Sequence, residues 1–215
     1  MEDVNSGVVI DKHGVLRRLD TADEIILELG CGRKKKFSHS IGIDLLDYPE
    51  VDIIGDVYEV LSRFPEGSVT HVYASHFIEH VDDLARLIRE FERILGVRGT
   101  ITLVAPHFSS PYFYSDPTHR SFFGLYTFCY FCDSNIFLRE VPKYAFESKL
   151  RLMNVDLVFK SPKPFYFRYA AKRFLGVLFN SCSYAKEFYE ENLSFIINCY
   201  EIIYTLERKI SEDRS

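Results

Sequence analysis

The residues best suited to chemistry lie where one apolar run ends in Gly30-Cys31-Gly32 and a second ends in Asp44. Glycine has no side chain, so the backbone of such a turn can come close to a ligand. If both runs are parallel strands, Asp44 lies beside the turn at the carboxyl edge of the sheet. There its carboxylate can accept hydrogen bonds from both hydroxyls of a ribose. The spacing therefore indicates a nucleoside site, although two glycines alone also occur in ordinary tight turns.

The segments that must position these residues are short apolar runs, which we expect to be buried strands at 24–29, 39–44, 51–57, 68–76 and 100–106. Before the last of them, apolar residues recur at three- and four-residue spacing from Leu84 to Leu95. This pattern predicts a helix that Asp82 or Asp83 caps and that ends at a left-handed Gly96. Strands and helices in this order predict a Rossmann-like, doubly wound α/β sheet.

After His107 the chain is rich in aromatic residues and prolines. We expect two further strands at 152–160 and 195–208, with a helix at 165–180 inserted between them. The sheet should then be mostly parallel, with an antiparallel last strand. We interpret residues 1–215 as one domain. Its core spans about 22–107 and 151–208, and helical and aromatic cap insertions span about 108–150 and 161–193.

Composition excludes several classes of protein. The net charge of -5 argues against a broad nucleic-acid surface. Neither a signal-peptide pattern nor a membrane-spanning apolar run occurs, so we expect a cytoplasmic protein. The five cysteines are an odd number, which argues against a disulfide framework. Cys129 and Cys132 form a lone CxxC, and we expect two thiols buried among aromatic rings.

Three stretches of the first half resemble the class I S-adenosylmethionine-dependent methyltransferases, in a form similar to type 11. They read "LELGCG", "GIDLLDYPEVDIIGDV" and "YASHFIEHVDDLARLIREFERILGVRGTITLVAPH". The stretch "HFSSPYFYSDPTHRSFFGLYTFCYF" is similar to bacterial and archaeal members often associated with sugar pathways. The resemblance implies that S-adenosylmethionine donates a methyl group to a small-molecule or sugar acceptor, on oxygen or on nitrogen. O-methylation is our expectation.

The resemblance also implies which residues contact the cofactor. They are Glu28, Gly30, Cys31 and Gly32 at the methionine part, Asp44 and Leu45 at the ribose, Asp56 and Val57 at the adenine, and Ser75 and His76 at the sulfonium. The chain departs from the pattern at Lys34, which takes the place of a third glycine, and the helix that should follow is cut to a turn or omitted. A dinucleotide enzyme needs that helix N-terminus for its pyrophosphate, whereas S-adenosylmethionine has no phosphate.

Methyl transfer from a sulfonium is a direct displacement that needs alignment and the exclusion of water. A hydroxyl acceptor also benefits from a general base, for which histidine suits neutral pH. We predict His119 or His107 as the base, with Asp116 as its orienting partner. His76 and His107 should end adjacent strands and face the same crevice. The alternative is that His119 only holds its loop in place.

Two other functions stay open. His76 and His80 stand four residues apart, which on a helix would place two metal ligands on one face, with Glu79 and His107 or His119 completing a site. A metal-dependent hydrolase is the weaker alternative, because the metalloprotease motif is absent and His76 should precede the helix; we therefore expect no metal. The other alternative is a nucleoside-binding scaffold subunit without turnover.

The segment 160–180 carries Lys160, Lys163, Arg168, Lys172 and Arg173 among aromatic residues, and it has no acidic residue. We expect a cap helix that packs its aromatic side on the core and leaves its basic side in solvent. Weak contact with an anionic membrane surface is the alternative. The sequence does not indicate an oligomeric state.

Overall fold

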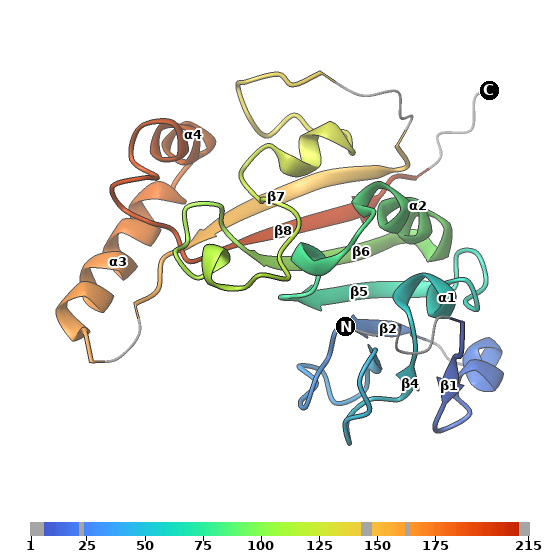
Figure 1. Ribbon diagram of the computed structural model, residues 1–215. Coiled ribbons are helices and arrows are strands. Elements are labelled where there is room, and N and C mark those ends of the chain that lie inside the picture. The colour runs from blue at the N-terminus through green and yellow to red at the C-terminus, as the bar shows by residue number, and fades with distance from the viewer. Residues whose placement is uncertain (1–6, 22–23, 143–147, 162–163, 211–215) are drawn as a thin grey trace, which may run out of the picture. The chain divides into compact units, whose positions relative to one another are not determined.

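The computed structural model describes residues 7–21, 24–142, 148–161 and 164–210 (Figure 1). The chain divides into two compact units. The first consists of Met1–Phe77, Asp83–Thr102 and Glu207–Ser215, and the second of Ile78–Asp82 and Leu103–Leu206. The fold class is confirmed: the chain forms a mixed α/β, Rossmann-like sheet that is mostly parallel and has antiparallel strands at its end.

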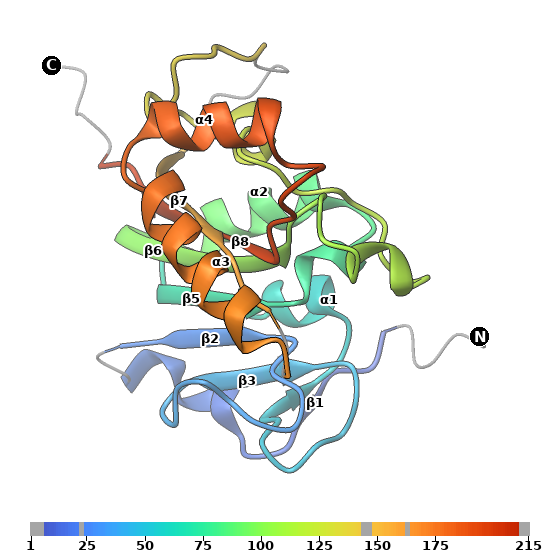
Figure 2. The same ribbon diagram turned by 90° about the vertical axis from the view of Figure 1, so that its left-hand side faces the viewer.

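The sheet of the first unit has the strand order β1-β4-β3-β2-β5, followed by the first part of β6 (Figures 1 and 2). These strands are β1 (Ile10–Asp11), β2 (Ile26–Leu29), β3 (Ile41–Asp44), β4 (Ile53–Ile54), β5 (Val69–Ser75) and β6 (Leu95–Pro106). β2 runs parallel to both β3 and β5, and Leu29 lies opposite Ile43 on one side and Ala74 on the other. The three strands therefore end together at one edge.

Two helices and a 3-10 helix, η1 (Val15–Thr21), complete the first unit. They are α1 (Val57–Leu61) and α2 (Leu84–Ile94). The predicted α2 is confirmed, including its cap, because the Asp83 carboxylate accepts a hydrogen bond from Arg86 N at 2.8 Å. Its buried side chains are Leu87, Ile88, Phe91 and Ile94. The prediction that α2 ends at a left-handed Gly96 is wrong, because Leu95 is already extended and β6 begins there.

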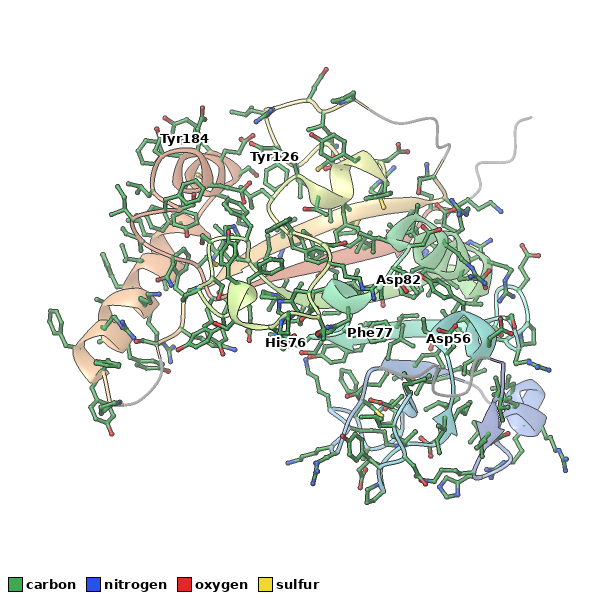
Figure 3. The ribbon with its side chains drawn as sticks, viewed as in Figure 1. Asp56, His76, Phe77, Asp82, Tyr126 and Tyr184 are labelled. Carbon is green, nitrogen blue, oxygen red and sulfur yellow. The ribbon has the colours of Figure 1, made fainter. Side chains whose placement is uncertain are left out.

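The predicted strand at 51–57 is too long, since only Ile53 and Ile54 are extended partners of a neighbour. Asp56 ends this run because its carboxylate accepts hydrogen bonds from Tyr58 N and Glu59 N and so starts α1 (Figure 3). A carboxylate at this position satisfies two of the orphan N–H groups of the first turn. The short helix α1 was not predicted, because five residues are too few to show a helical period.

In the second unit the end of β6 is followed by β8 (Glu201–Arg208) and β7 (Leu150–Val158). We expected the last two strands to form a hairpin-like pair, and they are neighbours in the sheet, although β8 begins six residues later than expected. Between them come α3 (Tyr166–Phe179) and the unpredicted α4 (Ser183–Asn192), which pack on one another (Figure 2). Two 3-10 helices, η3 (Phe113–Ser115) and η4 (Thr127–Tyr130), lie in the aromatic segment.

Aromatic rings build the core of the second unit. The rings of Phe128 and Tyr204 meet edge to face with centroids 4.5 Å apart, and Phe123 lies beside both. The Tyr204 hydroxyl donates a hydrogen bond to the Gly124 carbonyl at 2.6 Å, so this buried polar atom is satisfied. Cys129 and Cys132 are buried free thiols, as predicted.

The expected packing of α3 is wrong. Lys172, on its basic side, is buried, and its ammonium donates hydrogen bonds to the backbone carbonyl and side-chain oxygen of Asn198 at 2.8 and 2.6 Å. Phe167 and Phe174 are instead 90% and 70% exposed. Lys163 lies outside the described residues. Within the described ranges, no helix is long and apolar enough to span a bilayer.

The glycine turn after β2 depends on two glycines for different reasons. Gly30 and Gly32 both have a left-handed backbone, with φ of 61° and 59°. A Cβ on Gly30 would lie 2.7 Å from the ring of Phe77, the labelled residue that follows β5 (Figure 3). A Cβ on Gly32 would meet nothing within 4 Å. Gly30 is therefore required for packing, whereas Gly32 leaves open space above the turn.

This difference predicts unequal losses of stability. Gly32→Ala should lower the free energy of unfolding by about 1–2 kcal/mol, the strain of a left-handed residue. Gly30→Ala should lose about 1–3 kcal/mol more, because the new methyl group overpacks against Phe77. Urea denaturation without ligand measures both values. Equal losses in the two variants would show that Phe77 does not constrain the turn.

Candidate active site

Asp44 and the glycine turn are brought together at the carboxyl edge of the first unit's sheet. One carboxylate oxygen of Asp44 accepts a hydrogen bond from Gly32 N at 2.9 Å, and the other accepts one from Leu46 N at 2.9 Å. Gly30 N donates to the Ile43 carbonyl at 2.8 Å, which fastens the turn to the end of β3. Each oxygen of Asp44 keeps acceptor capacity for a further donor. The arrangement is the one expected for holding a ribose diol, and contact with a cofactor stays a prediction.

No helix forms between β2 and β3, where all residues are described, and Glu28 explains how the loop holds its shape without one. Its carboxylate accepts hydrogen bonds from Lys36 N at 2.8 and 2.9 Å, from Phe37 N at 3.3 Å and from the Ser40 hydroxyl at 3.2 Å. Glu28 is only 4% exposed, so these donors compensate its burial. The Glu28 carboxylate therefore orders the loop through these hydrogen bonds. A direct contact of Glu28 with the cofactor stays a prediction.

Cys31, between the two glycines, is a buried and unreactive thiol. Burial, followed by the negative charges of Asp44 and Glu28, raises the pKa of Cys31 to about 12. The thiol is therefore protonated at neutral pH and is not a nucleophile. Its contribution to the turn is to fill space beneath the backbone.

The remaining predicted cofactor residues also lie along this edge of the first unit. Asp56 follows β4, but one oxygen of its carboxylate is already engaged in capping α1, whose first residue is Val57. Leu45 follows Asp44 and is 51% exposed. Ser75 ends β5, and the next residue, His76, is exposed and has a left-handed backbone with φ of 53°. Such strain in a residue other than glycine is uncommon and often marks a functional site.

The second unit contains an open pocket of about 360 Å³. Its walls are mostly aromatic, with one carboxylate. The lining residues are Phe108, Tyr114, Phe122, Phe123, Gly124, Tyr126, Thr127, Tyr130, Glu190 and Phe195. Burial and a hydrogen bond to Glu187 raise the pKa of the Tyr126 hydroxyl, which excludes it as a base near neutral pH. An apolar pocket with few polar groups is typical of small-molecule sites.

His107 lies behind this pocket and is fully buried. Its Nδ1 accepts a hydrogen bond from Ser109 N at 3.1 Å, which assigns the proton of the neutral ring to Nε2. Nε2 then donates to one oxygen of Glu190 at 3.1 Å, and Leu125 N donates to the same oxygen at 2.8 Å. Both nitrogens of His107 are thus occupied within the protein. The other oxygen of Glu190 faces Gly124, where a Cβ would come within 3.2 Å of it.

His119 is oriented differently from our prediction. Its Nδ1 donates to the Phe113 carbonyl at 2.8 Å, whereas Asp116 lies 3.8 Å from Nε2, beyond hydrogen-bond distance. Asp116 binds Thr118 instead, through the hydroxyl at 2.6 Å and the amide at 2.9 Å, and these bonds lower the pKa of Asp116. The orienting partner of His119 is therefore a backbone carbonyl.

The alternative of a metal face formed by His76 and His80 on one helix is not realised, and His76 precedes the helix as predicted. β5 ends at Ser75, and His80 ends a separate 3-10 helix, η2 (Ile78–His80). His76 and His107 belong to different compact units, so their shared crevice stays a prediction. Glu190 was missed because nothing in the pattern around "EFYEENLSF" separates it from its glutamate neighbours.

Comparison with known proteins agrees with this geometry. Residues 27–103 match the family model described as "Methyltransferase domain". This segment contains β2, the glycine turn, Asp44, Asp56 and β5, which are the elements of the first unit's edge. No curated protein matches the chain significantly.

A solved structure supports the fold. A SAM-dependent methyltransferase from Archaeoglobus fulgidus has a TM-score of 0.54 and 18% identity, over 90% of this chain and 93% of that chain. An S-adenosylmethionine-dependent methyltransferase from Mesorhizobium loti is 17% identical over 93% and 98% of the two chains, with a TM-score of 0.46. Residues 27–103 are therefore similar to a methyltransferase domain, and the chain shares its fold with a SAM-dependent methyltransferase.

Proposed function

We propose that this enzyme transfers the methyl group of S-adenosylmethionine to a hydroxyl oxygen of a small-molecule or sugar acceptor. The observation that carries the proposal is the Asp44 carboxylate, hydrogen-bonded to Gly32 N at the end of β3 within the methyltransferase domain. It offers a diol receptor next to backbone that a ligand can approach. The loop after Gly32 lacks the helix N-terminus that a pyrophosphate needs, which favours a phosphate-free nucleoside.

The proposed cofactor contacts are made by residues at the carboxyl edge of the first unit's sheet. Asp44 and the adjacent Leu45 take the ribose, while Asp56 and Val57 at the start of α1 take the adenine. Gly30, Cys31 and Gly32 contribute backbone at the methionine part, and Glu28 acts there by ordering the loop. Ser75 and His76 lie at the reacting sulfonium. The exposed side chain of His76 supports this place, because its strained backbone turns it out of the strand.

The acceptor occupies the aromatic pocket of the second unit. Rings on most sides cover the apolar faces of a small molecule, and the Glu190 carboxylate accepts a hydrogen bond from its hydroxyl. Gly124 keeps the second oxygen of Glu190 accessible, because any larger residue would crowd it. This single carboxylate favours an acceptor with a hydroxyl over one with a negatively charged group.

Glu190 is proposed as the base because it is the one carboxylate that lines the pocket of the second unit. The oxygen nucleophile takes the methyl carbon, the electron pair of the breaking C–S bond goes to sulfur, and the hydroxyl proton goes to the free oxygen of Glu190. The products are the methyl ether and S-adenosylhomocysteine. His107 and Leu125 N hold the other oxygen, so His107 acts as a positioning residue. His119 and Asp116, our other candidates, form a separate cluster near η2.

We propose that the whole chain acts as one methyltransferase domain. We also propose that it works in a reducing compartment, the cytoplasm, because all five cysteines are free thiols.

A second role concerns α3. Its exposed side carries Phe167 and Phe174 together with Arg168 and Arg173. Aromatic residues beside cations suit the interface of an anionic lipid surface, where rings enter the headgroup region and cations meet phosphates. We propose weak, salt-sensitive contact of residues 160–180 with such a surface.

Asp44→Ala tests the cofactor site. Losing hydrogen bonds from both ribose hydroxyls to a carboxylate should weaken binding of S-adenosylhomocysteine by about 100-fold or more in calorimetric titration. The matched control is Asp47→Ala, which removes the same charge from an exposed carboxylate that pairs with Lys12 at 2.8 Å. Its affinity should equal that of the wild type. Equal affinities in both variants would remove Asp44 from the site.

Glu190→Gln tests the acceptor site. Without a proton acceptor, kcat for methyl transfer to hydroxyl acceptors should fall on the order of 100-fold, whereas binding of S-adenosylhomocysteine should not change. Glu191→Gln is the control on the same helix, since that side chain is exposed. Methyl transfer is followed by mass spectrometry of the product across a panel of phenols and sugars. An unchanged kcat in Glu190→Gln would contradict its role as base.

The lipid contact predicts sedimentation with anionic phospholipid vesicles at low salt, weakening as salt is raised. Vesicles of zwitterionic lipid should not bind. Arg173→Glu on α3 should abolish sedimentation, and Arg63→Glu, an equal charge change at an exposed position of the first unit, should not. Wild-type protein that stays in the supernatant at low salt would refute the contact.

A further inference from the structure

Glu79, His80 and His119 place three ligand atoms within 4.8 Å of one another in the second unit. We propose that these residues bind a divalent transition-metal ion. The proposal concerns a site outside the cofactor edge and the aromatic pocket, and it does not depend on the proposed methyl transfer. From the sequence we expected no metal, and the spacing drew attention to His76 and His80. The cluster in the structure contains His119 and does not include His76.

Two segments far apart in sequence are fastened together to form the cluster. Glu79 and His80 lie on η2, and His119 lies in the loop that follows η3. Arg120 N donates to the Glu79 carbonyl at 2.8 Å, and the Arg120 guanidinium pairs with Asp82. The backbone on both sides of the cluster is therefore anchored before any ion binds, as a preorganised site requires.

The hydrogen bonds of His119 point its coordinating nitrogen into the cluster. Its Nδ1 lies 2.8 Å from the Phe113 carbonyl, which only accepts, so Nδ1 carries the proton. Nε2 of the neutral ring then has a free lone pair, and it lies 3.9 Å from a Glu79 oxygen. A backbone carbonyl that fixes the tautomer in this way is the usual outer partner of a metal-binding histidine.

The same argument applies to His80 through Thr118. The Thr118 hydroxyl lies 2.6 Å from an Asp116 oxygen and 2.9 Å from Nδ1 of His80. A carboxylate can only accept, so the hydroxyl proton goes to Asp116 and the hydroxyl oxygen accepts from Nδ1–H of His80. The lone pair of His80 is thereby assigned to Nε2. The unprotonated nitrogen is therefore Nε2 in both rings, and the ring centroids lie 4.9 Å apart.

Glu79 supplies the negative charge. Its side chain has no exposed surface, and a buried carboxylate is stabilised by a cation within reach. Two imidazoles and one carboxylate form a donor set suited to Zn²⁺ and neighbouring first-row ions, whereas Mg²⁺ and Ca²⁺ prefer oxygen ligands. A tetrahedral ion holds its ligand atoms about 3.4 Å apart, so the pair at 3.9 Å needs to close only slightly.

The site also leaves room for further ligands. Asp116 has an oxygen 3.8 Å from Nε2 of His119, from which it can approach an ion directly or through water. With three protein ligands, one or more positions stay open to water or to an oxygen of a bound molecule, as in catalytic zinc sites. The alternative is a purely structural cluster, whose hydrogen bonds only hold the loop after η3 against η2. This alternative predicts that no ion binds.

The test uses the full-length chain without an affinity tag, after dialysis against a chelator. Zn²⁺ binding is measured by calorimetric titration, and Co²⁺ binding by visible absorption, which reports nitrogen and oxygen ligation without reference to activity. We expect one ion per chain. Glu79→Gln, His80→Gln and His119→Gln should each weaken binding by more than about 100-fold, beyond the loss typical of outer partners.

His39→Gln is the matched control, because His39 is exposed in the first unit and is the kind of residue that binds ions adventitiously. It should bind like the wild type. Circular dichroism checks that each variant folds; if the buried Glu79→Gln does not, the two histidine variants decide. The proposal is overturned if the wild type binds no stoichiometric ion, if the cluster variants bind normally, or if His39→Gln loses binding equally.

Discussion

The hydrogen bonds of the buried Glu28 carboxylate are the constraint on which the carboxyl edge of the first unit's sheet depends. Between β2 and β3 the chain has eleven residues and no helix to satisfy its backbone. Glu28 accepts from Lys36 N and Phe37 N, so the end of the loop is fixed before β3 starts. With the loop fixed, the Asp44 carboxylate accepts the hydrogen bond from Gly32 N. A buried carboxylate thus replaces a missing secondary-structure element.

The second unit uses the same device for another purpose. His107 and Leu125 N converge on one oxygen of Glu190, which fixes the carboxylate against a wall of aromatic rings. The cost of burying these polar groups is offset because each has a partner. At η2 a third set of polar side chains is oriented by backbone and hydroxyl groups. In all three places, a polar group inside an apolar environment holds a single geometry because moving would leave it unpaired.

α3 shows where reasoning from side-chain type fails. Its segment contains cations and aromatic rings, and burial of the rings was the natural expectation from hydrophobicity. Lys172 is buried instead, because the oxygens of Asn198 supply the partners that its ammonium needs. Phe179, at the end of the same helix, is the ring that enters the core beside Phe159 and Tyr189. Which side of a helix is buried depends on partners that come from distant parts of the chain.

The sequence by itself determined the order of strands and α2, the glycine turn, and the closeness of Asp44 to it, because these follow from local periodicity and from the rule that parallel strands end at one edge. It also carried the similarity to a methyltransferase domain, since the motifs lie within one continuous segment. Only the tertiary structure decided that Glu190 faces the pocket, that Phe113 orients His119, and that His80 joins Glu79 and His119. Leu125 and Glu190 are 65 positions apart, and Thr118 and His80 are 38 positions apart. No local pattern encodes a meeting that the packing of the whole unit produces.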